Sequence, residues 1–185
     1  MIYVIDHEDS FTYNLVHLLE SFAPTFVSNY YDLDRQKLEK SKIIVFSPGP
    51  GDPSHYPETQ KIYHKYKGAK KIIGICLGFQ QILYAENADI VPQKKIYHGY
   101  QSKIKTLNES VLFKANKIFL AGRYHSLKLK EPFKSSSLKI TMRCVKTNVA
   151  MAIEDTINNV YGFQFHPDSF LTVDGKFLIK KIIQA

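Results

Sequence analysis

Residues 71–81 read KIIGICLGFQQ, and this stretch decides the fold. The isoleucines of residues 72–75 predict a buried strand, and the apolar and amide side chains of residues 77–84 predict a helix. One glycine stands two residues before Cys76 and another two residues after it, so a sharp strand-to-helix turn is expected there. Such a turn exposes the sulfur, and the positive end of the helix favours its thiolate. Cys76 is therefore a candidate nucleophile; the alternative is a buried, inert thiol, the common state of free cysteine.

Before this stretch, predicted strands and helices alternate along the chain. Strands are predicted at residues 2–5, 25–30 and 42–46, and helices at residues 11–22, 33–40 and 58–67. In the first helix, apolar residues recur from Phe11 with helical spacing, and Asp9 or Ser10 is the expected N-cap. The apolar runs of the strands suit a sheet that helices cover on both faces. An α/β fold with a mostly parallel, mixed central sheet flanked by helices is expected.

From residue 90 onward the pattern changes to short strand-like segments without helical periodicity. These segments are residues 95–105, 117–129, 138–145, 149–153 and 160–165, and a terminal helix is predicted at residues 175–183. Such a run predicts a small antiparallel β extension of the sheet. A chain of 185 residues suits one domain that buries about 70% of its unfolded surface. A single domain over residues 1–185 is expected.

The composition excludes several classes of protein. Hydrophobic residues make up 44% of the chain and charged residues 23%, which indicates a globular fold rather than disorder. The N-terminus lacks the features of a signal peptide, and no apolar run reaches the roughly 18 residues of a membrane span. With only two cysteines, Cys76 and Cys144, a cytoplasmic location without membrane contact is expected. Cys144 lies in a strand-like run and is expected to be structural.

The net charge of +8 raises the alternative of nucleic-acid binding. The lysines are spread over many separate segments, however, and no nucleic-acid recognition motif accompanies them. Nucleic acid is therefore not an expected partner. The basic surface could instead steer an acidic protein or an anionic metabolite towards the chain.

A loop rich in proline and glycine, residues 47–53 (SPGPGDP), follows the third predicted strand. It falls beyond the carboxyl end of a parallel strand, where open α/β sheets usually bind ligands, and Cys76 falls at the same edge. A phosphate-binding loop is the competing interpretation, but prolines remove backbone donors and no Gly-Lys-Ser/Thr sequence follows. The remaining alternative is a tight connector without a role.

The second chemical stretch is residues 160–168, VYGFQFHPD, a predicted strand that ends in His166 and Asp168. A thiol nucleophile needs a base, and the base needs a carboxylate that fixes its tautomer. Cys76, His166 and Asp168 fill these roles if the sheet brings them together; otherwise His-Pro-Asp is an ordinary turn. His125 is a weaker candidate base because no carboxylate follows it. The seven histidines form no metal-binding motif, so no metal is expected.

Together, these motifs resemble the class I glutamine amidotransferases, and within them the glutaminase subunits of anthranilate synthase and aminodeoxychorismate synthase. The matching segments span nearly the whole chain: residues 9–15 (DSFTYNL), 47–51 (SPGPG), 74–78 (GICLG), 98–99 (HG), 123–127 (RYHSL) and 162–167 (GFQFHP). Each motif alone is weak, whereas their joint order and spacing are specific. The resemblance implies a flavodoxin-like sheet and a glutaminase without a cofactor.

The resemblance also implies a role for each matching residue. The thiolate of Cys76 would attack the side-chain carboxamide of L-glutamine and form a glutamyl thioester. His166 would act as base and then as acid, oriented by Asp168. Backbone N–H groups of Leu77 and Gly49 would stabilise the oxyanion. The residues that would hold the glutamine are Gly51, Gln80, Ser126 and Leu127. The segments that would face a synthase subunit are residues 9–14, 98–99 and 123–127.

Two positions depart from the family's pattern. Phe79 stands where the family usually has histidine, and Asp168 where it usually has glutamate. The shorter side chain of Asp168 reaches about 1.5 Å less far. Either the backbone after Pro167 moves closer, or a water intervenes, or His166 is poorly oriented. A working glutaminase of reduced rate is the expectation.

The favoured interpretation is the glutaminase subunit of anthranilate synthase, in tryptophan biosynthesis, delivering ammonia to a separate chorismate-binding subunit within a heteromer. The first alternative is the equivalent subunit of aminodeoxychorismate synthase, in folate biosynthesis. A docking subunit with impaired catalysis is the second alternative. An independent amidase or γ-glutamyl hydrolase on the same scaffold is the third.

Overall fold

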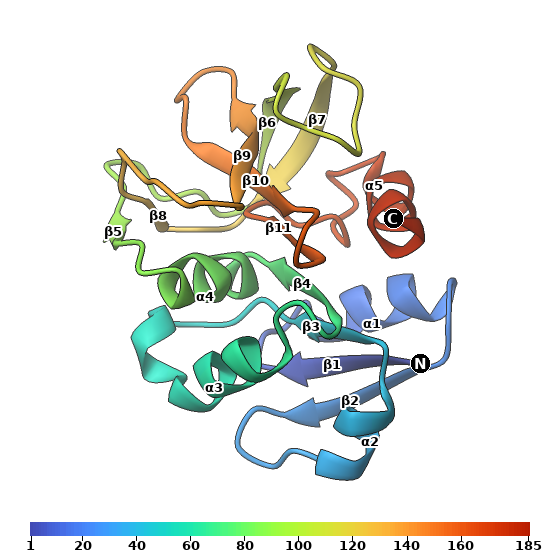
Figure 1. Cartoon of the computed structure of the whole chain (residues 1–185). Helices are drawn as coiled ribbons and strands as arrows, with labels where there is room; N and C mark the ends of the chain where they lie inside the picture. The colour runs from blue at the N-terminus through green and yellow to red at the C-terminus, as the bar shows by residue number, and fades with distance from the viewer.

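A computed structural model describes all 185 residues of the chain (Figure 1). Nine strands form one sheet in the order β2-β1-β3-β4-β11-β10-β9-β6-β7, and β5 and β8 form a separate antiparallel pair. The strands are β1 (Ile2–Asp6), β2 (Thr25–Asn29), β3 (Ile43–Phe46), β4 (Lys71–Ile75), β5 (Ile90–Pro92), β6 (Tyr100–Thr106), β7 (Ile118–Arg123), β8 (Leu127–Leu129), β9 (Lys139–Cys144), β10 (Ala150–Asp155) and β11 (Val160–Phe163). The helices are α1 (Thr12–Glu20), α2 (Arg35–Lys40), the short 3-10 helix η1 (Pro53–His55), α3 (Pro57–Tyr66), α4 (Leu77–Ala85) and α5 (Gly175–Gln184). None of these helices has the length and apolarity that a membrane crossing requires.

Five strands of the main sheet, β2, β1, β3, β4 and β11, run parallel to one another. Their order is that of flavodoxin-like sheets, in which ligands bind where the strand order reverses, between β1 and β3. The fifth strand, β11, comes from the distant C-terminal part of the chain and pairs with β4, with Phe163 opposite Ile75. This pairing puts the carboxyl ends of β4 and β11 side by side. The predicted α/β fold with a mixed sheet flanked by helices is confirmed.

The other four strands of the main sheet, β10, β9, β6 and β7, are antiparallel and form the upper part of Figure 1. The antiparallel extension therefore contains four of the nine strands of the main sheet. Two predicted segments within it are wrong in detail. Residues 117–129 do not form one strand, because the chain leaves the main sheet after β7 and pairs with β5 as β8. Residues 95–105 are extended only within β6, because Gly99 has a φ of 74°, which a strand cannot hold.

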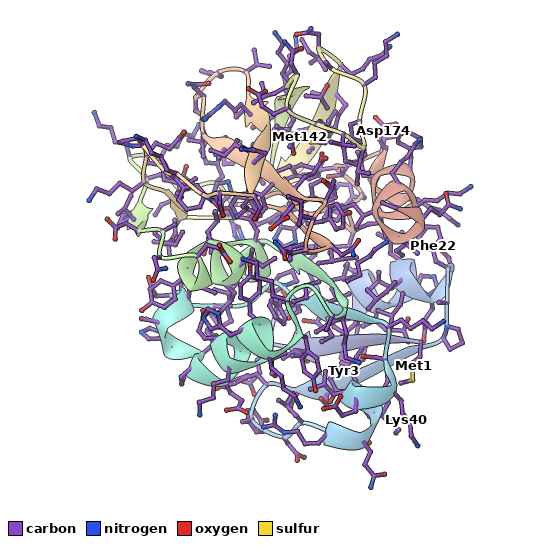
Figure 2. All side chains as sticks on the ribbon, viewed as in Figure 1. Met1, Tyr3, Phe22, Lys40, Met142 and Asp174 are labelled. Atoms are coloured by element: carbon purple, nitrogen blue, oxygen red, sulfur yellow. The ribbon has the colours of Figure 1, made fainter.

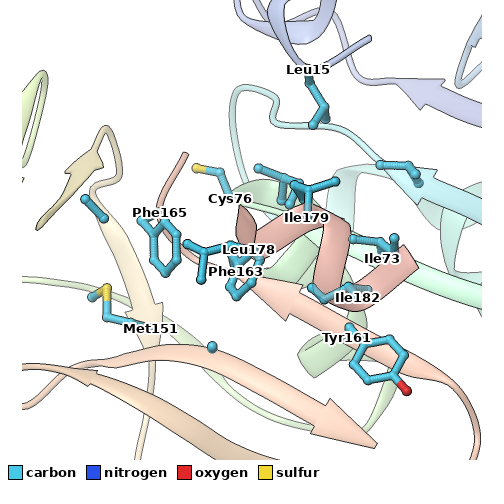
Figure 3. Packing of buried hydrophobic residues seen from close by; sticks show 14 of the residues in the cluster. Leu15, Ile73, Cys76, Met151, Tyr161, Phe163, Phe165, Leu178, Ile179 and Ile182 are labelled. Atoms are coloured by element: carbon cyan, nitrogen blue, oxygen red, sulfur yellow. The ribbon is translucent and has the colours of Figure 1, made fainter. Parts of the chain in front are cut away.

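Helices cover both faces of the parallel strands, and alternate residues of each strand point into one of two cores. In β1, Ile2 and Val4 belong to a cluster with α1 and α5, whereas Tyr3 and Ile5 belong to a cluster with α2, α3 and α4. Figure 3 shows part of the first cluster, to which α5 contributes Leu178. Side chains fill the space between the sheet and the helices (Figure 2). Burial on both faces explains why these strands carry continuous apolar runs.

The start of α1 differs from the expected cap. The N-cap is Phe11, and no side chain accepts a hydrogen bond there. Oδ1 of Asp9 instead accepts a hydrogen bond from the N–H of Phe11 at 2.8 Å, within the turn that precedes the helix. The expectation that Asp9 or Ser10 caps the helix is therefore wrong. The predicted helices otherwise agree with α1 to α5 within two residues at each end.

Candidate active site

Cys76 lies between β4 and α4 in a backbone conformation that residues other than glycine rarely adopt. Its φ is 52° and its ψ is −101°, and it is the N-cap of α4. Two glycines make this turn possible. A Cβ on Gly74 would lie 2.3 Å from the carbonyl oxygen of Gly78. A Cβ on Gly78 would lie 2.1 Å from the carbonyl oxygen of Phe46. The expected sharp turn is present, and such strain is typical of a nucleophile held at the positive end of a helix.

The sulfur of Cys76 lies at the margin of the core cluster drawn in Figure 3. Only 7% of the residue is exposed, so the expectation of an exposed sulfur is wrong for this structure. The thiol is therefore screened from bulk water, which strengthens its interactions with charged and polar neighbours.

The loop after β3 comes close to this turn. A Cβ on Gly49 would lie 2.6 Å from both Cβ of His7 and Cδ2 of Leu77, so only glycine allows this approach. The N–H of Leu77 lies in the first turn of α4, where helical N–H groups lack intrahelical partners. The structure thus brings Gly49 and Leu77, the two expected oxyanion donors, together next to Cys76.

His7 supports this loop from the end of β1. Its side chain is fully buried; Nδ1 lies 3.3 Å from Oγ of Ser47, and Nε2 lies 2.9 Å from Oγ1 of Thr59. Burial lowers the pKa of His7 to about 3, although a backbone hydrogen bond at Ser47 opposes the shift. A neutral imidazole therefore ties β1, the loop and α3 together. Sequence reasoning missed this role; the signal was a histidine directly after an apolar strand, at the edge where ligands bind.

His166 follows β11 and is held through both its backbone and its ring. Its N–H donates to the carbonyl oxygen of Gly122 in β7 at 3.0 Å, and Oγ1 of Thr172 donates to its carbonyl oxygen at 2.7 Å. The rings of Phe11 and Tyr124 approach the imidazole edge-on, with centroids 5.2 Å and 4.8 Å away. These two rings were not expected next to the base, since they come from segments far away in the sequence. The backbone bonds position the residue, and the two rings confine the plane of the imidazole.

Two neighbouring side chains act on the charge of the His166 imidazole. Burial alone would lower the pKa of His166, but the neighbouring Cys76 thiolate and the Asp168 carboxylate raise it well above its usual range. The register of β11 against β4, with Phe163 opposite Ile75, places Cys76 and His166 beyond the same ends of neighbouring strands, although neither ring nitrogen of His166 makes a hydrogen bond of regular geometry. An imidazolium beside a thiolate is the ionised pair that activated cysteines use.

Asp168 faces His166 across a gap. Its Oδ1 lies 3.7 Å from Nδ1 of His166, and both side chains are almost completely shielded from solvent. A normal hydrogen bond would be about 2.7–3.2 Å long. Neither carboxylate oxygen of Asp168 has a hydrogen-bond partner. The backbone after Pro167 therefore does not come close enough to restore the hydrogen bond, which was one of the three arrangements expected for the shorter side chain.

Gln164 is a site residue that sequence reasoning missed. Its Nε2 lies 3.9 Å from Sγ of Cys76 and 3.5 Å from the carbonyl oxygen of Cys76, and its Oε1 accepts a hydrogen bond from Nε2 of Gln80 at 3.0 Å. Gln80 is only 3% exposed, and its Nε2 also lies 3.5 Å from the carbonyl oxygen of Leu127. The two amides thus form a buried chain from the thiol to the start of β8. The signal was a single amide inside the apolar run that leads to His166.

His125 is not available as a base. Nε of Arg123 donates to its Nε2 at 3.0 Å, and its Nδ1 lies 2.7 Å from the carbonyl oxygen of Leu127, which fixes Nδ1–H as the neutral tautomer. Burial and the Arg123 charge lower the pKa of His125 to about 3. Both ring nitrogens are therefore occupied. The choice of His166 as the base stays a prediction.

The remaining residues expected to hold glutamine lie at the surface. Ser126 and Gly51 are exposed, and Leu127 is half-buried. Gly51 has a φ of 76°, a conformation that glycine adopts without strain. Phe79 is fully buried in the cluster with α2, α3 and α4, whereas Cys76 belongs to the cluster on the opposite face. Phe79 is thus a core residue that does not face the thiol.

No group of three or more histidine, cysteine, aspartate and glutamate residues is arranged to hold a metal ion. The arrangement that the structure does provide is a thiol, an imidazole and two backbone donors at one edge of a parallel sheet. Such a site can attack a carbonyl group and stabilise the resulting oxyanion.

Comparisons with known proteins agree with this arrangement. Residues 3–185 match the family of class I glutamine amidotransferases. The chain is 34% identical over 185 residues to anthranilate synthase component 2 of Lactococcus lactis subsp. lactis (strain IL1403), covering 99% of this chain and 93% of that protein.

Two solved structures share the fold. One is a protein of Thermoplasma acidophilum described as a candidate GMP synthase subunit, with a TM-score of 0.85 and 20% identity over 99% of this chain and 92% of that one. The other is a glutamine amidotransferase of Thermotoga maritima, with a TM-score of 0.73 and 13% identity over 99% of this chain and 96% of that one. Fold and family agree: the chain belongs to the class I glutamine amidotransferases, and it is an enzyme of that family.

Proposed function

We propose that this chain is the glutaminase subunit of an anthranilate synthase, which hydrolyses L-glutamine and delivers ammonia to a chorismate-binding synthase subunit. The observation that carries the proposal is the strained Cys76 turn beside His166. Similarity along nearly the full length to anthranilate synthase component 2 of Lactococcus lactis supports the assignment to this subunit.

The reaction begins with attack of the Cys76 thiolate on the side-chain carbonyl carbon of glutamine. The carbonyl oxygen becomes an oxyanion, and the N–H groups of Leu77 and Gly49 donate hydrogen bonds to it. The imidazolium of His166 then protonates the leaving nitrogen. Ammonia departs as the C–N bond breaks, which leaves a γ-glutamyl thioester on Cys76 and a neutral His166.

Hydrolysis of the thioester completes the cycle. Neutral His166 takes a proton from water, and the hydroxide attacks the thioester carbonyl at the same oxyanion donors. The C–S bond breaks, glutamate leaves, and Cys76 and His166 return to the thiolate–imidazolium pair. The Asp168 carboxylate stabilises the imidazolium electrostatically, across 3.7 Å rather than through a hydrogen bond.

The exposed surface next to His166 supports a protein partner. Phe11 and Tyr124 lie 4.8 Å apart, and His98 lies 6.1 Å from Tyr124, so three segments distant in sequence gather at one side of the site. Tyr13, in the same region of the chain as Phe11, is 70% exposed. Exposed aromatic rings are typical of protein interfaces. A heteromer in which the synthase partner covers this surface would keep ammonia away from bulk water.

The equivalent subunit of aminodeoxychorismate synthase is the second candidate, because its glutaminase chemistry is the same. A docking subunit with impaired catalysis also has one specific observation in its favour, the gap between His166 and Asp168. The identity of the synthase partner and the rate of glutamine hydrolysis separate these possibilities.

The test measures glutamate release from glutamine by the wild type and by Cys76→Ser, each with and without a chorismate-aminating subunit. The expected result is wild-type activity that appears or rises with the partner, and none from the variant. Chorismate is then added, and anthranilate is distinguished from aminodeoxychorismate by its fluorescence and mass. Equal inactivity of both proteins with either partner would overturn the proposal in favour of a docking role.

A further inference from the structure

A cavity separate from the active site lies between α5 and the loop that joins β6 to β7. Its volume is about 340 Å³, near the lower end of the roughly 300–1,000 Å³ of small-molecule pockets. None of the residues placed in the active site lines it. Figure 2 labels Asp174, a lining residue at the start of α5.

The floor and walls of this cavity are apolar. Phe113 and Leu178 line it and are 7% and 3% exposed. Phe119 is half-buried, with its ring 5.7 Å from that of Phe165 in the core. Phe177 stands at the rim with 54% of its surface exposed. Three phenylalanine rings on one small cavity favour a ligand with an aromatic or branched apolar body.

The rim of the cavity is basic. Lys114, Lys117 and Lys181 line it, all three are exposed, and none of them forms an ion pair within the chain. Asp174 is the one acidic residue that lines the cavity. Three ammonium groups against one carboxylate give the mouth a positive potential, which favours an anion over a neutral or cationic ligand. The methylene stems of the lysines can also extend the apolar wall while their charges stay in water.

We propose that this cavity binds a small amphipathic carboxylate, with its apolar body among the phenylalanines and its carboxylate at the three lysines. An apolar interior and unpaired cations from two separate elements coincide at this cavity. Lys114 and Lys117 come from the loop, and Lys181 comes from α5. The proposal is independent of the glutaminase assignment, because it uses none of the active-site residues.

The test titrates the full-length protein with 3-phenylpropionate and follows backbone amide shifts by NMR. The shifts are expected to concentrate at residues 112–119 and 174–181. The alcohol 3-phenylpropan-1-ol has the same carbon skeleton without the charge. We expect it to bind roughly tenfold more weakly, the combined effect of three exposed ion pairs. Binding of the acid, but not of the alcohol, should weaken as salt is raised from low to high ionic strength.

Variants at the surface keep the test independent of folding. Replacing any one of Lys114, Lys117 and Lys181 by glutamine should lower the affinity for 3-phenylpropionate roughly two- to fivefold. The triple variant should bind the acid and the alcohol with equal affinity. Lys180→Gln is the matched control, because Lys180 is an exposed lysine of the same helix that does not line the cavity. Its affinity should equal that of the wild type. Equal affinities for acid and alcohol in the wild type, an unchanged triple variant, or shifts centred elsewhere would overturn the proposal.

Discussion

Nδ1 of His166 lies 3.7 Å from Oδ1 of Asp168, and neither atom has a hydrogen-bond partner. Both side chains are shielded from solvent, so the pair interacts by charge at close range without the directional bond that would fix the imidazole. The orientation of His166 therefore depends on its backbone bonds and on the rings of Phe11 and Tyr124. This separation leads to the first prediction.

Asp168→Glu should raise kcat for glutamine hydrolysis about fivefold, the effect of one additional hydrogen bond. The added methylene extends the carboxylate by about 1.5 Å, more than the gap that separates it from a normal hydrogen bond to His166. Steady-state glutamate release with the synthase partner measures the change. Asp168→Asn is the matched control: it keeps the size, removes the charge, and should lower kcat. A large loss of rate in Asp168→Glu would contradict the prediction and show that aspartate is already fitted to this site.

Alanine variants are usually more stable than glycine variants, and the strain at Cys76 predicts the opposite order there. Cys76→Gly should be more stable than Cys76→Ala by about 1 kcal/mol, because glycine tolerates a φ of 52° and alanine does not. Urea unfolding of the two inactive variants measures the difference. Cys144, in the regular strand β9, provides the control, since Cys144→Gly should be less stable than Cys144→Ala by roughly 0.5–1 kcal/mol. The same order at both positions would argue against strain at Cys76.

Gly49→Ala should remove most of the catalytic rate while leaving the protein folded. The new methyl group would lie 2.6 Å from both His7 and Leu77, which forces the loop away from the thiol and misplaces an oxyanion donor. Loss of one such donor costs about 100-fold in kcat. Gly68→Ala is the control, because the φ of 77° at Gly68 also disfavours alanine, but Gly68 precedes β4, at the end of that strand opposite to Cys76. Its kcat should stay at the wild-type value even if stability falls.

His7 and His125 predict a loss of stability as the pH falls from 6 to 5. Burial lowers both pKa values to about 3, so in this range the unfolded chain binds protons at these residues while the native state does not. Each histidine therefore contributes stability that is present above its unfolded pKa of about 6.5 and lost towards the folded value. The slope is up to about 1.4 kcal/mol per pH unit for each group.

Urea unfolding at several pH values between 6 and 5 checks this prediction. His7→Asn and His125→Asn should each flatten the dependence by the contribution of one histidine. His17→Asn, at an exposed position of α1, should leave the slope unchanged. Parallel curves for all four proteins would mean that the buried histidines are not the source of the acid sensitivity.

Local patterns predicted most of the elements and the sharp turn at Cys76. The turn at Cys76, the loop at residues 47–53 and the alternating strands and helices depend on residues close together in sequence, where apolar periodicity and glycine placement are informative. The break between β7 and β8 was missed, because both segments have strand-like sequences and differ only in the strands they pair with. The contacts of His7 and Gln164 were missed as well, since they join elements distant in sequence.

The sequence by itself predicted that Cys76 sits at a sharp strand-to-helix turn, because glycines flank it between an apolar strand and a helical pattern. It also placed a histidine and an aspartate at the end of a later strand. Only the tertiary structure decided that these groups meet, because the parallel register of β11 against β4 brings together residues that are 90 positions apart. The tertiary structure also decided that His166 and Asp168 lie too far apart for a hydrogen bond. Gly175 packs directly against the backbone between His166 and Asp168. A Cβ on Gly175 would lie 1.8 Å from the carbonyl oxygen of Pro167. Side-chain distances of this kind follow from the packing of whole elements, which local spacing does not encode.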